Sequence, residues 1–391
     1  MYVRKLKKEE RFEAGRISMI AFHERLESNP EEKRAECEQE TVEDWGAFTD
    51  EGTMMARIIN NRFLTYFDGH RIENGGIGAV STLPEYRESG AIKEILLNLL
   101  PVAYENGEII STLFPFNQAF YRKFGYETVC WQHNYEFAPS VLQGYHFVGT
   151  AQLWNPADSV VEYTKLYNKF AANYNLAVWR DDERMLNQHI KGEYYKDRKF
   201  CYLLSDEEGP SAYLIFQDVH NDPAAILRVE DIAWDGKRGF YAILGFLSRF
   251  AADYGMIQMF LPAGVELLSI IQSPRSYEIN KVTRQDYMVR VVNVEKLLAL
   301  MHKPDEDSFV IQVTDEIISA NNGIWFVKGD SAVSTDTAPD IIVSERALAQ
   351  MAVGCVDLDE AILRRDVTLH GNEQVLKKVF IRKKLLMEEY F

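Results

Sequence analysis

The chain has 391 residues, enough for two or three domains, and 47% of them are hydrophobic, so it can bury sizeable cores. Its 43 Lys and Arg against 59 Asp and Glu give a formal net charge of −16, which disfavours nucleic acid and anionic membranes and favours cationic molecules, although an acidic solvated surface gives the same charge. The cysteines Cys37, Cys130, Cys201 and Cys355 lack metal or redox spacing, and no apolar run reaches the roughly 20 residues that span a membrane. We therefore expect a cytoplasmic protein with reduced thiols.

Strands and helices are mixed in the first 140 residues, as in an α/β domain. The apolar pattern predicts a strand over 1–6, a helix from about residue 9, and a hairpin formed by 54–57 and 61–67. The elements expected next are a strand over 77–82, a helix from about 91 to 104, and strands over 108–114 and 127–137.

The junction between the strand over 77–82 and the following helix has the features of an anion site. A turn at Pro84 leads into a tight segment, Arg87-Glu88-Ser89-Gly90-Ala91-Ile92, which opens the helix. The first backbone N–H groups of a helix are unpaired, and together with the helix dipole they attract negative charge. A plain strand–turn–helix junction with a surface arginine would have the same pattern.

Two motifs resemble those of the GNAT acetyltransferases. Arg87-x-x-Gly90-x-Ile92 after a strand resembles the acetyl-CoA pyrophosphate loop, and Tyr121-x-x-Phe124-Gly125-Tyr126 resembles the tyrosine segment of that fold. With a three-part chain that ends in Phe391, the whole resembles the enhanced intracellular survival (Eis) acetyltransferases. Many GNAT loops have Gly or Ala at the position of Ile92, whereas Eis-type loops tend to carry a bulky apolar residue there. Many also have a second basic residue at the position of Glu88, so a weaker affinity for phosphate is expected.

The resemblance implies an α/β and α+β architecture of tandem GNAT domains, the second degenerate, followed by a sterol-carrier-like α+β domain. The expected boundaries are 1–140 for the acetyl-CoA-binding GNAT domain, 145–286 for the degenerate copy and 287–391 for the C-terminal domain. Residues 229–232 and 235–239 resemble a worn copy of the strand and loop, without the Arg-x-x-Gly spacing or the tyrosine motif. We therefore expect a structural second domain that binds no CoA. The fold of the third domain does not by itself set a ligand.

Acetyl transfer to an amine needs a held CoA, a polarised thioester, a base and an acid. The resemblance places the pyrophosphate on the loop of Arg87, Glu88, Ser89, Gly90, Ala91 and Ile92, and the pantetheine along a splayed strand that contains Val80 and Thr82. A tyrosine hydroxyl stays protonated at neutral pH and can donate to the departing thiolate. Tyr121 is the expected acid, with Tyr126 as the competing residue.

The first domain offers no obvious base, and His23 and Glu24 are its nearest titratable candidates. Eis-type enzymes resemble each other in using the C-terminal carboxylate, which here belongs to Phe391; a frayed tail is the alternative. Phe22, Glu24 and Glu389, with Glu388, are candidates for a pocket that receives a cationic amine.

Together these features predict an N-acetyltransferase that moves acetyl from acetyl-CoA directly to an aminoglycoside-like, polyamine or lysine amine. The histidines show no ligand spacing, so we expect no metal. We also expect no nucleic-acid or membrane partner, and a homo-oligomer, which resemblance suggests is a hexamer. The alternative is a non-catalytic CoA- or lipid-binding protein that uses a pocket of the C-terminal domain.

Overall fold

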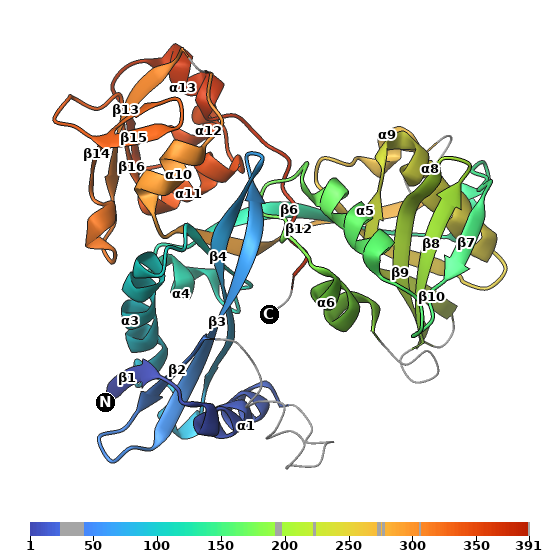
Figure 1. The fold of residues 1–391 in the computed structure, drawn as a ribbon, viewed down its shortest axis with the longest axis horizontal. Helices are drawn as coiled ribbons and strands as arrows, with labels where there is room; N and C mark the ends of the chain where they lie inside the picture. The colour runs from blue at the N-terminus through green and yellow to red at the C-terminus, as the bar shows by residue number, and fades with distance from the viewer. Residues whose placement is uncertain are drawn as a thin grey trace. The chain divides into compact units, whose positions relative to one another are not determined.

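A computed structural model describes residues 1–23, 43–191, 198–221, 224–271, 275, 278–304 and 306–389 (Figure 1). The chain forms two compact units. The first contains residues 1–129 and 286–383 together with Glu388 and Glu389, and the second contains residues 130–285 and 384–387. No helix in the described part of the chain is both long and apolar enough to cross a membrane.

The first 129 residues build a sheet with a helix on each face. Strands β1 (Tyr2–Lys5), β2 (Glu43–Phe48), β3 (Met54–Phe67) and β4 (His70–Thr82) pair antiparallel in this order, and β5 (Ile110–Leu113) pairs parallel with β4. Helix α1 (Arg11–Phe22) packs on one face, preceded by η1 (Lys8–Glu10). Helix α3 (Ala91–Glu105), expected from about 91 to 104, covers the other face with an apolar stripe in which Ile95, Leu96, Leu99 and Leu100 are buried.

Residues 54–67 form one strand, so the hairpin expected between 54–57 and 61–67 is wrong. The turn lies at Asp68 and Gly69, whose φ angles of 47° and 84° are both positive, as the tight two-residue hairpin turn requires. Asn60 interrupts the apolar pattern in the middle of β3, but it is fully buried, and its side-chain amide donates to Glu108 at 2.9 Å. A polar residue whose hydrogen bond is made inside the protein can thus be mistaken for a turn residue when only the sequence is read.

Strand β12 (Ile279–Val291) completes the sheet of the N-terminal region. Its residues Met288–Val291 pair antiparallel with Leu113–Ile110 of β5. The N-terminal sheet therefore contains a strand that is contributed about 175 residues later in the sequence (288 − 113 = 175).

The remainder of the first unit is a separate five-stranded sheet in the order β15-β14-β13-β16-β17. Ser344 caps helix α11, because its Oγ accepts from the Ala347 amide at 3.1 Å. The elements are α10 (Val294–Leu300), β13 (Ser308–Thr314), η6 (Ser319–Asn321), β14 (Gly323–Lys328), β15 (Ser331–Ser334), β16 (Ile341–Ser344), α11 (Glu345–Val353), α12 (Leu358–Ala361), β17 (Val367–Leu369) and α13 (Glu373–Val379).

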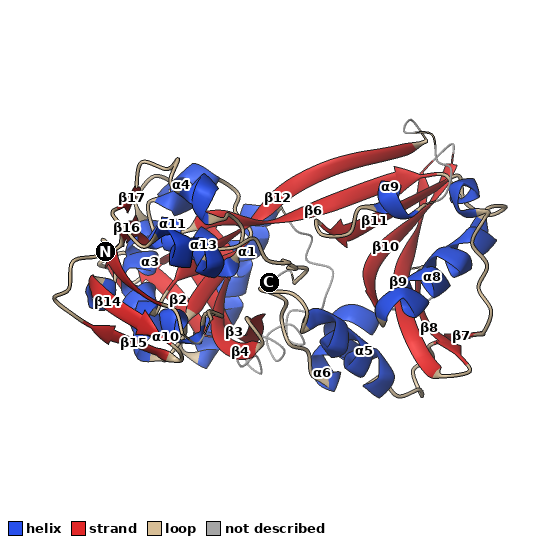
Figure 2. Cartoon of the chain, turned by 90° about the horizontal axis from the view of Figure 1, so that it is seen from above, coloured by secondary structure: helices blue, strands red, loops and turns tan. Residues whose placement is uncertain are grey.

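The second unit contains a sheet in the order β6-β11-β10-β9-β8-β7, with its helices packed on it (Figure 2). Residues 182–190 form a short α-helix, α6, followed directly by a π-helix, η4. The elements are β6 (Glu127–Phe137), η3 (Pro139–Leu142), β7 (Thr150–Leu153), α5 (Val161–Ala171), α6 (Asp182–Arg184), η4 (Met185–Ile190), β8 (Lys199–Asp206), β9 (Gly209–Asn221), β10 (Ala224–Trp234), α8 (Gly236–Leu247), η5 (Ser248–Phe250), β11 (Met256–Pro262) and α9 (Leu267–Ile270).

The connectivity of the second unit repeats that of the first. Strands β9 and β10 pair antiparallel, α8 follows, and β11 returns to pair parallel with β10, as β3, β4, α3 and β5 do. The loop differs, because Asp235 stands before α8 and forms an ion pair with Lys169 at 2.8 Å. A carboxylate at this helix N-terminus opposes a second anion. The topology thus supports an internal duplication whose second copy has lost the phosphate loop.

Candidate active site

Strands β4 and β5 separate at the point where the site begins. Their parallel pairing ends at Ile77 and Leu113, whereas β4 continues to Thr82, paired with β3 alone among the described strands. The register between β3 and β4 shifts at Ala79, a non-glycine residue with a φ of 49°. This bulge leaves Val80 and Thr82, both half-buried, on a strand with one open edge. An extended ligand can add to such an edge through backbone hydrogen bonds.

A chain of buried hydrogen bonds supports the bulge from the face of α1. Arg57 is held by Asp44 at 2.7 Å and donates to the Ser18 hydroxyl at 3.4 Å. The Ser18 and Ser81 hydroxyls lie 3.0 Å apart, and Ser81 donates to the Ala79 carbonyl at 3.0 Å. Burial raises the pKa of Asp44, although Arg57 acts against this shift. The sequence analysis did not predict this hydrogen-bonded chain. Its only trace in the sequence is the alternation of polar and apolar residues along the strands.

The loop after β4 and η2 (Pro84–Tyr86) presents an uncapped helix start. Gly90 stands at the N-cap of α3 with a φ of 84°, and no side chain caps the helix. The amides of Arg87 and Ser89 donate to backbone carbonyls of the turn at 3.3 Å, so two of the expected anion-binding amides are already used. The first helical hydrogen bond runs from Glu94 to Gly90 at 3.0 Å. The amides between these positions, including those of Ala91 and Ile92, are the orphan donors of the helix.

The loop's side chains face solvent. Arg87, Glu88 and Ser89 are exposed, whereas Ala91 is buried and Ile92 half-buried. Glu88 has a φ of 66°, a conformation that non-glycine residues adopt rarely. The loop therefore combines an exposed guanidinium with backbone donors, and the carboxylate of Glu88 partly offsets their positive charge.

The tyrosine segment begins with a capped, five-residue helix. Asn117 caps α4 (Gln118–Arg122) through Oδ1, which accepts from the Phe120 amide at 3.1 Å. Tyr121 is 1% exposed, with its ring edge-on to those of Phe116 and Phe120. Burial raises the pKa of Tyr121 above its usual value near 10. The hydroxyl consequently carries its proton at neutral pH.

Tyr121 and Tyr126 differ in what their hydroxyls contact. The Ser111 hydroxyl donates to the Gly75 carbonyl at 2.8 Å, so it accepts from the Tyr126 hydroxyl 2.7 Å away. The proton of Tyr126 is therefore engaged in a fully buried chain. No hydrogen bond involves the Tyr121 hydroxyl within the described residues, and Val80 and Ile92 pack against the core cluster that contains its ring.

A buried acid lies next to these strands. Glu108 is inaccessible to solvent, and burial raises its pKa to about 7. Its Oε1 accepts from Asn60, whereas Glu108 Oε2 and Asn60 Oδ1 have no partner in the part of the chain that the structure describes. A proton on Oε2 would satisfy both atoms, as in an acid–amide pair. Gly75 is required here, since a Cβ atom would lie 2.1 Å from Glu108 Oε2.

The other predicted site residues differ in exposure, and two of them lie outside the described part of the chain. Phe22 ends α1 and is 50% exposed, whereas Glu389 is only 2% exposed. Glu24 and Phe391 lie outside the described residues. Of the predicted site residues, Tyr121 belongs to a core cluster against which Val80 and Ile92 pack. The proposed base and the acidic pocket remain predictions. No group of three or more His, Cys, Asp or Glu side chains within the described ranges could hold a metal ion.

Comparison with known families agrees with this geometry. Residues 2–129 match the acetyltransferase (GNAT) domain, and residues 294–386 match the sterol carrier protein domain. These matches define the class: the chain contains an N-terminal acetyltransferase (GNAT) domain, which supports an acyl-CoA-dependent N-acetyltransferase, and a C-terminal sterol carrier protein domain. No curated protein sequence matches the chain.

Solved structures share the fold over the whole length of the chain, and an Eis protein is among them. Eis1 from Mycobacterium abscessus has a TM-score of 0.82 with 19% identity, and the match covers 100% of both chains. A GCN5-related N-acetyltransferase from Anabaena variabilis has a TM-score of 0.86 with 19% identity over 100% of both chains. A probable N-acyltransferase from Enterococcus faecalis also has a TM-score of 0.86 with 19% identity, over 100% of this chain and 99% of its own.

Proposed function

We propose that this protein transfers acetyl from acetyl-CoA directly to a primary amine of a cationic acceptor, with Tyr121 as the general acid. The observation that carries the proposal is the buried, protonated Tyr121, whose ring shares a core cluster with Val80 of the open strand and Ile92 of the loop. A thiolate that leaves along that strand would depart toward a group that can protonate it.

The reaction follows from the chain's own groups. The orphan amides at Gly90, Ala91 and Ile92, with the Arg87 guanidinium, bind the pyrophosphate. The backbone amide of Val80 donates to the thioester oxygen, and Thr82 continues the strand that holds the pantetheine. The amine attacks the carbonyl carbon, the C–S bond breaks, and the thiolate takes the proton of Tyr121, which solvent then replaces.

The amine must also lose a proton, and we assign this step to the Phe391 carboxylate acting through a water. A carboxylate with a pKa near 3.5 is a weak direct base, and burial would raise its pKa. The net charge of −16 supports a cationic acceptor, such as an aminoglycoside, a polyamine or a lysine side chain. Phe22, Glu24 and Glu389 are the residues we assign to its pocket. Similarity in fold to Eis1 is consistent with this class.

The test is release of free thiol from acetyl-CoA in the presence of a panel of amines, with the Tyr121→Phe variant in parallel. Turnover of at least one cationic amine that the variant loses, with acetyl-CoA affinity unchanged, is the expected result. Intact acetyl-CoA binding without turnover of any amine would remove the proposed activity.

The alternative, a lipid-binding protein that uses a pocket of the C-terminal domain, gains no support from the cavity beside that domain. A cavity of about 400 Å³ adjoins the sterol carrier protein domain, and its lining includes charged residues of both signs, among them Arg122, Lys123, Glu345, Arg346 and Asp366. Such a wall does not suit an apolar chain.

Two further parts of the proposal concern the cell and the assembly. The spacing of the cysteines, which fits neither a metal site nor a redox motif, supports a reducing, cytoplasmic setting. We propose a hexamer by resemblance to Eis, which light scattering on the purified protein would test.

A further inference from the structure

The turn that follows Tyr121 accepts a hydrogen bond from a side chain of β12. Arg290 is fully buried, and its Nε donates to the Phe124 carbonyl at 2.7 Å. Its Nη1 donates to the Val291 carbonyl at 2.6 Å, and its Nη2 donates to Asp315 at 2.7 Å. All three nitrogens of the guanidinium are therefore engaged, and one of them holds the tyrosine segment.

Asp315 fixes the other end of this contact. Its Oδ1 accepts from the amides of Ile317 and Ile318 at 2.9 and 3.0 Å, in addition to Arg290. Its Oδ2 accepts from the side chain of Asn321 at 2.8 Å, which also donates to the Val292 carbonyl at 3.0 Å. A buried ion pair with all its hydrogen bonds made has one favoured geometry. The sterol carrier protein domain thus supplies a rigid anchor.

The close packing of Arg290 explains the glycine of the tyrosine motif. Gly125 has a φ of 82°, and a Cβ atom there would lie 2.9 Å from Arg290 Nε and 3.0 Å from Glu345 Oε1. Both the backbone conformation and the approach of the guanidinium exclude a side chain at this position. In this motif the phenylalanine carbonyl accepts from the arginine, and the absence of a side chain at the glycine leaves room for the guanidinium.

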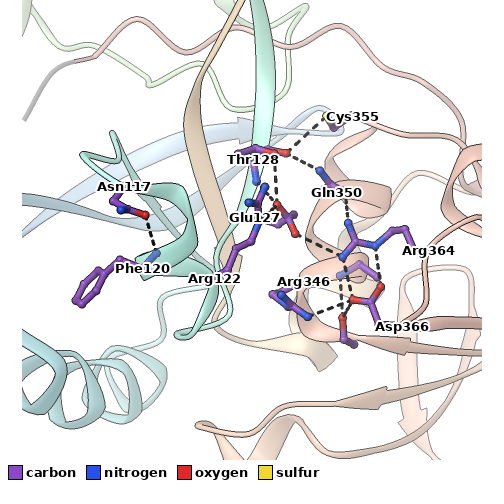
Figure 3. A network of polar contacts seen from close by, with 12 residues as sticks. Asn117, Phe120, Arg122, Glu127, Thr128, Arg346, Gln350, Cys355, Arg364 and Asp366 are labelled. Atoms are coloured by element: carbon purple, nitrogen blue, oxygen red, sulfur yellow. Dashed lines mark hydrogen bonds and ion pairs between the residues drawn. The ribbon is translucent and has the colours of Figure 1, made fainter.

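A second set of contacts holds the same segment from the side of α11 (Figure 3). Arg122 pairs with Glu127 at 2.8 Å, and Glu127 lies 3.5 Å from Arg364. Gln350 donates to the Thr128 carbonyl at 2.7 Å. Glu127 and Thr128, which follow the Gly125 turn, are thereby attached directly to the C-terminal domain, and Arg122 before the turn is linked to it through Glu127.

We propose that the Arg290–Asp315 pair is a positioning element for Tyr121, so that the sterol carrier protein domain sets the geometry of the general acid. This inference rests on the proposed role of Tyr121. Helix α4 has only five residues, too few to hold its own shape in water, so the ring's place depends on what grips the turn beyond it. A misplacement of about 1 Å at a reacting group costs about 10²-fold in rate.

A double-mutant cycle tests the proposal in the full-length protein. Arg290→Lys keeps the charge but cannot make all three contacts, and we expect kcat to fall about 10- to 100-fold while the KM for acetyl-CoA changes little. In a Tyr121→Phe background the same change should have no further effect, because Arg290 acts through the hydroxyl. Arg180→Lys, at an equally buried pair with Asp231 in the second unit, is the matched control and should leave kcat unchanged.

Equal losses from Arg290→Lys in both backgrounds would overturn the proposal, since the arginine would then act independently of Tyr121. A second outcome would contradict the role of Tyr121 as the acid. In that outcome Tyr121→Phe is itself fully active, and Arg290→Lys loses activity whether or not Tyr121 is replaced. Asp315→Asn, which retains the shape of the pair, replaces Arg290→Lys if the latter does not fold, with the same expectation.

A readout without turnover completes the test. With 3-fluorotyrosine at position 121, the ¹⁹F resonance should shift or broaden in Arg290→Lys and remain unchanged in Arg180→Lys. An unchanged resonance in Arg290→Lys would show that the ring does not depend on the arginine, whatever the enzyme's acceptor, and would end the proposal.

Discussion

The Tyr126 hydroxyl donates to the Ser111 hydroxyl at 2.7 Å, and the Ser111 hydroxyl donates in turn to the Gly75 carbonyl at 2.8 Å. This chain engages one of the two tyrosines of the motif and leaves the other available. Tyr121→Phe should therefore lower kcat by about 10²-fold or more, in line with the loss of a general acid.

Tyr126→Phe is the matched control, and it should cost about 1 kcal/mol of unfolding free energy with little effect on kcat. Thiol-release kinetics and urea unfolding of both variants check this pair of expectations. The assignment of the acid would be reversed if Tyr126→Phe were the inactive variant.

Gly90→Asp should abolish acetyl-CoA binding. It places a carboxylate at the uncapped start of α3, where the pyrophosphate would lie, and charge repulsion should raise the Kd by about 100-fold or more. Gly90→Ala carries the same positive-φ strain without the charge, and apart from the adjoining backbone no atom of the described residues lies within 4 Å of the added Cβ. Calorimetric titration should show a change of only a few-fold for Gly90→Ala. Normal affinity in Gly90→Asp would mean that the phosphate site lies elsewhere.

Glu108 should make stability depend on pH in an unusual direction. Its pKa is about 7 in the folded state and 4.5 when unperturbed, so the folded state holds the extra proton between these values. The free energy of unfolding therefore falls as pH rises through this window and is level above it.

Glu108→Gln is the matched variant, because its amide can pair with Asn60 at every pH. The stability difference between the wild type and this variant should change by about 2 kcal/mol between about pH 5.5 and about pH 8, with the variant favoured at the higher pH. Urea unfolding at the two pH values measures it. A constant difference would show that Glu108 titrates normally.

Extension of the chain beyond Phe391 should reduce activity without loss of folding. A short Gly-Ser tail moves the terminal carboxylate away from Phe391 while leaving every other residue in place. The same tail at Met1 is the control, since that end contains no group assigned to the reaction. Thiol release and thermal unfolding are to be compared, and an active C-terminally extended enzyme would rule out the terminal carboxylate as the base.

Local patterns in the sequence predicted the parts of the fold that depend on near neighbours. The helix expected from about 91 to 104 is confirmed as α3, because its apolar pattern is set by residues within one or two helical turns. The GNAT resemblance likewise rests on two short motifs, and the family match confirms the domain. Which of the loop amides bind an anion remains a prediction.

Contacts between distant residues could not be predicted in this way. Asn60 looks like a turn until Glu108, 48 residues away, is placed beside it. Arg290 meets Phe124 across 166 residues, and nothing in the pattern around either residue indicates the other. The hydrogen-bonded chain from Arg57 to the Ala79 carbonyl could not be predicted for the same reason, because it forms only when α1 packs against the bulge.

The pairing of β12 with β5 has a consequence for fragments of this protein. A chain cut after residue 140 would contain every residue of the matched acetyltransferase domain yet lack Met288–Val291, so β5 would present an open edge to other molecules. It would also lack Arg290. The catalytic domain is discontinuous in the sequence, and such a fragment should aggregate rather than work as a minimal enzyme.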